Sequence, residues 1–235
     1  MKRIISIILA VCLLICMAVP AFADNKKELN FSVLSDIHYF PKEYIGNLNG
    51  FNYRRTLDND LKLEQYADEI LDEAIREILA KGSKVVLISG DNAMGCEYLS
   101  HEMLTAKLRK LTDAGVKVYT VPGNHDISRP DKISKSFVAD DPAKTVVKAG
   151  TTYVDDRIVE VRGTTKSEFA ELYKDFGYGD DESIIARDPG GSLSYSADLG
   201  SGYRLIAIDA NEYSGELCTS KRYLEGDLLN WVNSQ

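Results

Sequence analysis

The chain has 235 residues and a formal net charge of −8 at pH 7. An acidic surface argues against a protein that binds duplex nucleic acid or anionic lipid, because both partners require a basic surface. The sequence contains no internal repeat, low-complexity tract or proline-rich linker, which favours a single globular domain.

The first 23 residues have the three parts of a secretory signal peptide. Lys2 and Arg3 precede an apolar run over residues 4–19, and Ala21-Phe22-Ala23 follows Pro20. We therefore expect a signal peptide at 1–23 with cleavage after Ala23, and a secreted, extracellular or cell-surface protein without stable membrane insertion. Removal of this segment leaves residues 24–235, which are 212 residues with a formal charge of −10.

The next part of the chain alternates between strand and helix patterns. Short apolar runs predict strands, and apolar residues at helical spacing followed by Gly82 or Gly115 predict helices, the second of which Ser100 could cap. In chain order the predicted elements are a strand at 29–38, a helix at 61–82, a strand at 84–91, a helix at 100–115 and a strand at 116–126. This βαβαβ order with continuous apolar strands indicates an α/β fold whose parallel sheet is covered by helices.

The second half of the chain is less regular. Residues 127–164 mix polar residues with short apolar pieces and are interpreted as a long insertion. Residues 165–179 predict a helix that starts with a Thr165/Glu168 capping box. Residues 192–211 predict a hairpin, and residues 223–235 begin an amphipathic helix.

Polar residues follow each of the first three predicted strands. Because right-handed crossovers bring the carboxyl ends of parallel strands to one rim, we expect these residues to lie together. They are Asp36 and His38, then Asp91 and Asn92, and finally Asn124, His125 and Asp126. Asp36 and His38 would point to the same side of an extended chain. Oxygen donors with imidazole suit Mn, Fe or Zn.

Such a group can act as a dinuclear metal centre. Asp36, His38, Asp91 and Asn124 are the candidate metal ligands, and two divalent ions would generate a hydroxide that attacks a phosphoryl group. His125 would be the catalytic general acid or charge stabiliser, with Asp126 orienting its ring. Each motif alone also fits an ordinary turn or helix cap, but their placement after three successive strands favours the metal centre.

These motifs resemble the calcineurin-like metallophosphoesterase superfamily, and the closer similarity is to its secreted bacterial members. The similarity extends over residues 29–235. It implies a layered β-sandwich flanked by helices, two divalent metal ions (Mn, Fe or Zn), and hydrolysis of phosphomonoesters or phosphodiesters. In the same positions, Asp36 and His38 would hold the first metal, Asp91 would bridge, and Asn124 would hold the second, beside the catalytic His125 and its support Asp126.

The sequence also departs from the family pattern. Members carry further ligand histidines downstream, whereas this chain has three histidines and none after His125. His101 lies inside a predicted helix, where we expect a solvated surface residue. The departure suggests a chain that is incomplete at its C-terminus, or a degenerate relative.

Three functions remain open at this point. The leading expectation is a secreted metallophosphoesterase acting on a small phosphorylated substrate. The alternative is a catalytically degenerate cell-surface binding protein on the same scaffold. A single-metal nuclease is a weaker third reading, because the chain has no basic stripe.

Overall fold

The computed structural model describes residues 28–45, 63–129, 148–154, 157–222 and 224–235. The predicted signal peptide at 1–23 lies outside these residues. Within the part of the chain that is described, no helix has both the length and the apolar character needed to cross a membrane.

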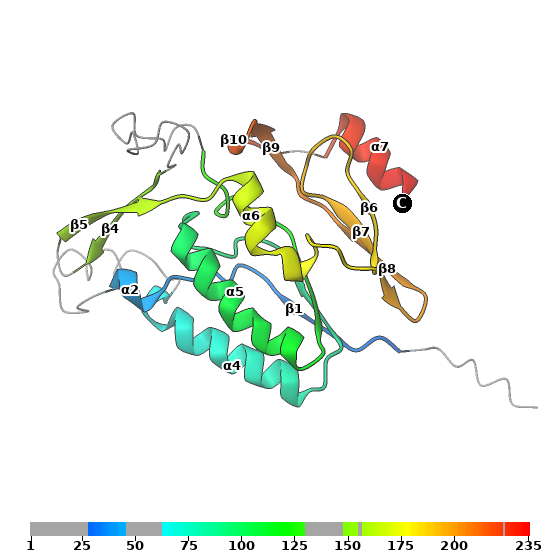
Figure 1. Cartoon of the computed structure of the whole chain (residues 1–235), viewed down its shortest axis with the longest axis horizontal. Helices are drawn as coiled ribbons and strands as arrows, with labels where there is room; N and C mark the ends of the chain where they lie inside the picture. The colour runs from blue at the N-terminus through cyan, green and yellow to red at the C-terminus, as the bar shows by residue number, and fades with distance from the viewer. Residues whose placement is uncertain (1–27, 46–62, 130–147, 155–156, 223) are drawn as a thin grey trace, which may run out of the picture.

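The first three predicted strands form one parallel sheet, as expected. They are β1 (Phe31–Leu34), β2 (Val85–Ile88) and β3 (Lys117–Thr120), with β2 in the centre. Leu34 pairs with Ile88, and Ile88 pairs with Thr120. The last residues of the three strands are therefore in register, and the loops that follow them leave the sheet at the same edge (Figure 1).

Two helices that run in the same direction cover one face of this sheet (Figure 1). The 3-10 helix η1 (Glu64–Tyr66) leads into α4 (Ala67–Ala80), and α5 (Tyr98–Asp113) follows β2. α4 ends just before Gly82, whose φ of 66 only glycine adopts without strain. The predicted cap at Ser100 is wrong: the N-cap residue is Glu97, and Ser100 is buried in the first turn, where its hydroxyl donates to Glu97.

The strands β2 and β3 have buried residues on both of their faces, whereas Phe31 and Val33 of the edge strand β1 are exposed. Val86 and Ile88 of β2 pack into the cluster that contains Leu71, Leu104 and Leu108 of the helices. The alternate residue Val85 belongs to a second cluster on the other face of the sheet. Burial of each such side chain contributes roughly 1.5–3 kcal/mol, so these contacts fix the sheet beneath the rim.

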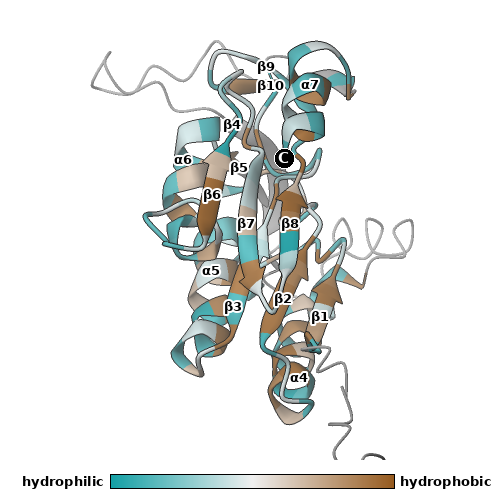
Figure 2. Cartoon of the chain, turned by 90° about the vertical axis from the view of Figure 1, so that its right-hand side faces the viewer, coloured by the Kyte–Doolittle hydropathy of each residue, from teal (hydrophilic) through white to brown (hydrophobic). Residues whose placement is uncertain are grey.

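A second sheet covers the other face. It consists of β6 (Ile184–Arg187), β7 (Tyr195–Gly200) and β8 (Tyr203–Ala207), all antiparallel, and includes the predicted hairpin. Tyr195, Ala197 and Ala207 pack against Val85 and Tyr119 of the parallel sheet. Figures 1 and 2 show β7 and β8 on the side of the parallel sheet away from α4 and α5. The fold is therefore the predicted α/β sandwich flanked by helices.

The predicted insertion at 127–164 contains a hairpin that the sequence did not predict. β4 (Lys148–Val154) pairs with β5 (Arg157–Arg162) in antiparallel orientation. Both strands are rich in Thr, Val and Ile, which favour extended backbone. The short helix α2 (Lys42–Ile45) contacts β4.

The remaining elements lie in the second half of the chain. The capping box of Thr165 and Glu168 is present at the start of α6 (Lys166–Leu172), which leads into the 3-10 helix η3 (Lys174–Phe176). β9 (Asn211–Ser214) and β10 (Leu217–Arg222) form a further hairpin that the sequence did not predict. The predicted last helix is α7 (Gly226–Ser234).

Candidate metal centre

Three candidate ligands have an unusual backbone conformation. Asp36, His38 and Asp91 have φ values of 52, 44 and 51. Left-handed backbone in a residue other than glycine costs on the order of 1–3 kcal/mol and persists where surrounding contacts impose it. The expectation that Asp36 and His38 share one side of an extended chain is therefore wrong, because the chain turns at both residues.

Backbone hydrogen bonds between the two loops impose these turns. The N–H of Asp36 donates to the carbonyl of Gly90 at 3.3 Å, and that of His38 donates to the carbonyl of Asp91 at 2.9 Å. The N–H of Tyr39 continues the series to Asn92 at 2.8 Å. These hydrogen bonds connect the loop after β1 to the loop after β2, beyond the ends of the two strands.

These turns bring two carboxylates to one imidazole. Nε2 of His38 lies 3.9 Å from Oδ1 of Asp36 and 3.8 Å from Oδ2 of Asp91. The His38 and Asp91 side chains are 11% and 15% exposed, whereas that of Asp36 is 64% exposed. His38 and Asp91 therefore form the inner part of the group, and Asp36 lies at its open side.

The loop after β3 adds His125 to this group. Its backbone N–H donates to Oδ1 of Asp91 at 3.0 Å, and its ring lies edge-on to that of His38 with 4.8 Å between the centroids. Nδ1 of His125 lies 2.5 Å from the carbonyl oxygen of Met94. Because a carbonyl only accepts hydrogen bonds, Nδ1 carries a proton toward Met94, and Nε2 is the other ring nitrogen.

Asp126 does not orient the His125 ring as predicted. Its carboxylate turns inward and accepts hydrogen bonds from the N–H groups of Gly123 (2.6 Å) and Ala93 (2.8 Å) and from the side chain of Asn92 (3.1 Å). Asp126 is fully buried, and this burial raises the pKa of its carboxyl group to about 7. Asp126 therefore holds the loop together from inside the protein.

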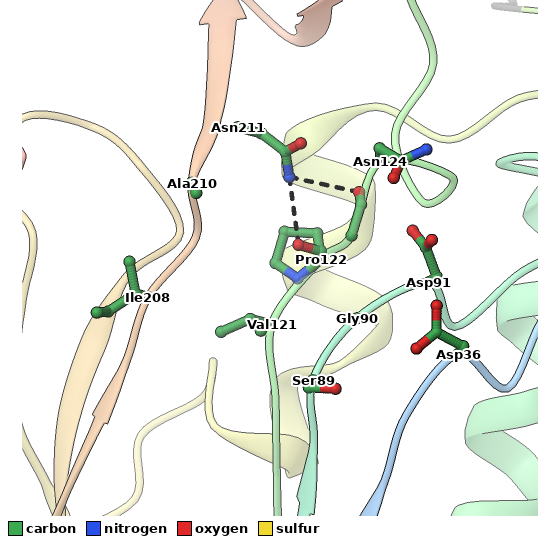
Figure 3. A pocket seen from close by; sticks show the side chains of 11 residues that line it. Asp36, Ser89, Gly90, Asp91, Val121, Pro122, Asn124, Ile208, Ala210 and Asn211 are labelled. Carbon is green, nitrogen blue, oxygen red and sulfur yellow. Dashed lines mark hydrogen bonds between the residues drawn. The ribbon is translucent and has the colours of Figure 1, made fainter. Parts of the chain in front are cut away.

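A cavity of about 250 Å³ opens over these loops (Figure 3). Asp36, Asp91 and Asn124 line one part of it, and their side chains point toward one another. The segment after β8 closes the other part with Ala210 and Asn211. Asn211 is not among the site residues predicted from the sequence, although it is a polar residue that follows an apolar strand, like the predicted rim residues.

The side chains present fit a divalent cation. His38, Asp91 and His125 each offer a ligand atom, and these atoms all lie within 4.8 Å of one another. Two atoms that bind the same ion at about 2.1 Å are at most about 4.2 Å apart, so a small contraction of the group completes the site. Two imidazoles and a carboxylate are donors that Mn, Fe and Zn accept.

His101 lies away from this cavity and is not the surface residue that we expected. It is fully buried, with Nδ1 at 2.8 Å from the hydroxyl of Tyr173 and Nε2 at 2.9 Å from the carbonyl of Asp126. The carbonyl can only accept, so Nε2 carries the proton and Nδ1 accepts from the Tyr173 hydroxyl. His101 supports the loop of Asp126 and is not among the residues that line the cavity.

A family model covers the part of the chain that contains this site. The model of the calcineurin-like phosphoesterases matches residues 29–200, which include all three loops of the site. No curated protein matches the chain. Because the matched region spans more than half of the sequence and the structure has the predicted layered fold, this chain belongs to the calcineurin-like phosphoesterase family.

Proposed function

We propose that this protein hydrolyses small phosphomonoesters or phosphodiesters with two divalent cations, which are Mn, Fe or Zn. The observation that carries the proposal is the convergence of side chains from three separate loops on one cavity. Asp36 and His38 would hold the first cation, Asp91 would bridge, and Asn124 would hold the second. When bound, the cations supply a nucleophile at neutral pH and neutralise the charge of the phosphoryl group.

The chain's own residues supply orientation and proton transfer. Met94 holds the Nδ1 proton of His125, so that Nε2 can carry a proton toward a leaving oxygen. The hydrogen bond from the His125 backbone to Asp91 holds this residue beside the carboxylate that would bridge the two cations. This one hydrogen bond connects the proposed catalytic residue His125 to the proposed cation ligand Asp91.

The charge of the chain supports a cation-dependent site. Asp36 and Asp91 both face the cavity, and the whole chain has a net charge of −8. A phosphate would be repelled by these carboxylates unless cations neutralised them first. We therefore infer that cation binding precedes substrate binding.

The test is a hydrolysis assay with chromogenic phosphate monoesters and diesters. We expect turnover in the presence of Mn²⁺, Fe²⁺ or Zn²⁺ that a chelator abolishes, and a loss of at least about 100-fold in Asp91→Asn. Asp113→Asn is the matched control, because Asp113 is an exposed carboxylate at the end of α5, outside the cavity. Absence of turnover with all three metals would contradict the proposal.

A binding protein on the same scaffold is the second candidate. Among the described residues, His38, Asp91 and His125 form a group that can hold one ion, while Asp36 and Asn124 line the cavity beside Asp91 and are the remaining candidates for a second. A site that holds only one cation tightly would favour binding without turnover. Retention of a phosphorylated ligand with no hydrolysis would select this candidate.

We also propose that the protein is secreted. The support is the N-terminal pattern, which consists of two basic residues, an apolar run and Ala21-Phe22-Ala23. Expression in a bacterial host with N-terminal sequencing of the extracellular protein tests it. A mature chain that starts at Asp24 is the expected product, whereas an uncleaved intracellular chain would contradict it.

A further inference from the structure

The loop that carries Asn124 is attached to a residue far along the chain. Nδ2 of Asn211 lies 3.2 Å from the carbonyl oxygen of Pro122 and 3.3 Å from that of Gly123 (Figure 3). Asn211 is only 8% exposed and lines the same cavity as Asp91 and Asn124. Its amide therefore contacts the two residues that directly precede a candidate metal ligand.

Gly123 is held from three directions. Its N–H donates to Asp126 at 2.6 Å, and its carbonyl accepts from Asn211 at 3.3 Å. Its Cα packs directly against Asp91, because a Cβ at this position would lie 2.2 Å from both the backbone nitrogen and Oδ1 of Asp91. Asn124 directly follows Gly123, so a movement of the Gly123 peptide changes the distance between Asn124 and Asp91.

The side chain of Asn211 is itself fixed in place. Oδ1 of the fully buried Asp209 accepts from the backbone N–H of Asn211 at 3.0 Å and from its Nδ2 at 2.8 Å. Oδ2 of Asp209 accepts from the backbone N–H of Leu193 at 2.9 Å and from the hydroxyl of Tyr213 at 2.5 Å. These bonds orient the amide of Asn211 toward the Gly123 loop, so the segment after β8 is coupled to the metal centre.

We propose that Asn211 is a positioning residue that sets the place of Asn124 relative to Asp91, and thereby the affinity of the site for divalent cations. The inference rests on the proposed function, because it takes Asp91 and Asn124 as cation ligands. The competing explanation is that Asn211 only satisfies two buried carbonyl groups. That explanation predicts lower stability without a change in the cation site of the folded protein.

The experiment compares Asn211→Leu, which keeps the branching at Cγ but is larger and has no hydrogen-bonding atoms, with Asn211→Ala and the wild type. The measurements are the Mn²⁺ dissociation constant by calorimetry and the visible absorption spectrum of the Co²⁺-loaded protein, which reports ligand geometry. Ser194→Ala is the matched control. Ser194 is 2% exposed and bonds to the backbone of Asp209, and none of its hydrogen bonds in the described structure goes to the Gly123 loop.

We expect both Asn211 variants to bind Mn²⁺ about 10–100-fold more weakly than the wild type, with a changed Co²⁺ spectrum, and Ser194→Ala to bind within about 2-fold of it. Folded Asn211 variants with wild-type affinity and spectrum would overturn the inference. Failure of both Asn211 variants to fold, while Ser194→Ala folds, would also overturn the inference. If the wild type binds Mn²⁺ but does not hydrolyse esters, a weakened Asn211→Leu still supports the inference although the proposed function fails. A wild type that binds no Mn²⁺ contradicts both.

Discussion

The backbone N–H of His125 lies 3.0 Å from Oδ1 of Asp91, while Oδ2 of the same carboxylate lies 3.8 Å from Nε2 of His38. One carboxylate therefore connects the loops that follow all three parallel strands. The residues of these loops lie far apart in the sequence, and Asp36 and His125 are separated by 89 positions. The three loops therefore meet only in the folded chain.

The first prediction concerns the role of His125. Its Nδ1 proton is held by Met94, so Nε2 is the atom available for proton transfer. We expect His125→Asn to lower kcat by about 10²–10⁴-fold while Mn²⁺ affinity falls less than in His38→Asn, because His38 is the proposed metal ligand. Steady-state kinetics and calorimetry on both variants check this. An equal loss of affinity in the two variants would assign His125 as a ligand instead.

The second prediction concerns the close approach of Gly123 to Asp91. A Cβ at Gly123 would lie 2.2 Å from two atoms of Asp91, so Gly123→Ala must displace either the carboxylate or the loop of Asn124. We expect Mn²⁺ affinity to fall at least about 10-fold. Gly82→Ala is the control, because Gly82 has a φ of 66 and open space around it. This substitution should cost about 1–2 kcal/mol of stability and leave the Mn²⁺ affinity unchanged. Thermal denaturation and Mn²⁺ titration of both variants separate the two effects.

The parallel half of the fold could be predicted from the sequence because its signals are local. The run of Val85–Ile88 is apolar throughout, and the polar residues Asp91 and Asn124 come soon after strands of this kind. Parallel topology then places those residues at one rim. The hairpin β9–β10 could not be predicted, since strands such as Asn211–Ser214 have neither a continuous apolar run nor a clear alternation.

The details of the site depend on contacts that no local pattern contains. The left-handed turns at Asp36 and His38 come from hydrogen bonds to the loop of Asp91, more than 50 positions away. The sequence predicts that Asp126 orients the His125 ring, but its carboxylate accepts hydrogen bonds from the N–H groups of Gly123 and Ala93 instead. Adjacent residues in a loop can point to opposite sides, so sequence position alone does not establish a contact.

The third prediction concerns the buried His101. Burial lowers the pKa of its imidazole to about 4, compared with 6.5 for an exposed histidine. Between these two pH values the unfolded chain binds a proton that the folded protein does not, so the free energy of unfolding falls as the pH is lowered. The loss should reach about 2 kcal/mol at pH 5.

The measurement is urea denaturation at pH 7 and pH 5 for the wild type and His101→Gln. The variant should lose about 2 kcal/mol less stability than the wild type over this interval. Burial of Asp126 acts in the opposite direction, because its raised pKa of about 7 makes the folded protein bind a proton first, but this contribution is present in both proteins. A pH dependence that is the same in the two proteins would contradict the buried, neutral state of His101.

The fourth prediction separates cation binding from catalysis. A ligand that binds only the folded state stabilises it by about 2.7 kcal/mol at a concentration 100 times its dissociation constant. For a domain of this size, such a gain corresponds to a rise in Tm of about 5–10 °C. We expect Mn²⁺ to raise the Tm of the wild type and of Asp113→Asn by this amount, with reversal by a chelator, and to have little effect on Asp91→Asn. Because Asp91 lies beside both His125 and His38, we expect the loss of its negative charge to weaken cation binding more than the loss of any other single charge of the site. An Asp91→Asn variant that Mn²⁺ stabilises as much as the wild type would show that the cations bind elsewhere, whether or not the protein hydrolyses phosphate esters.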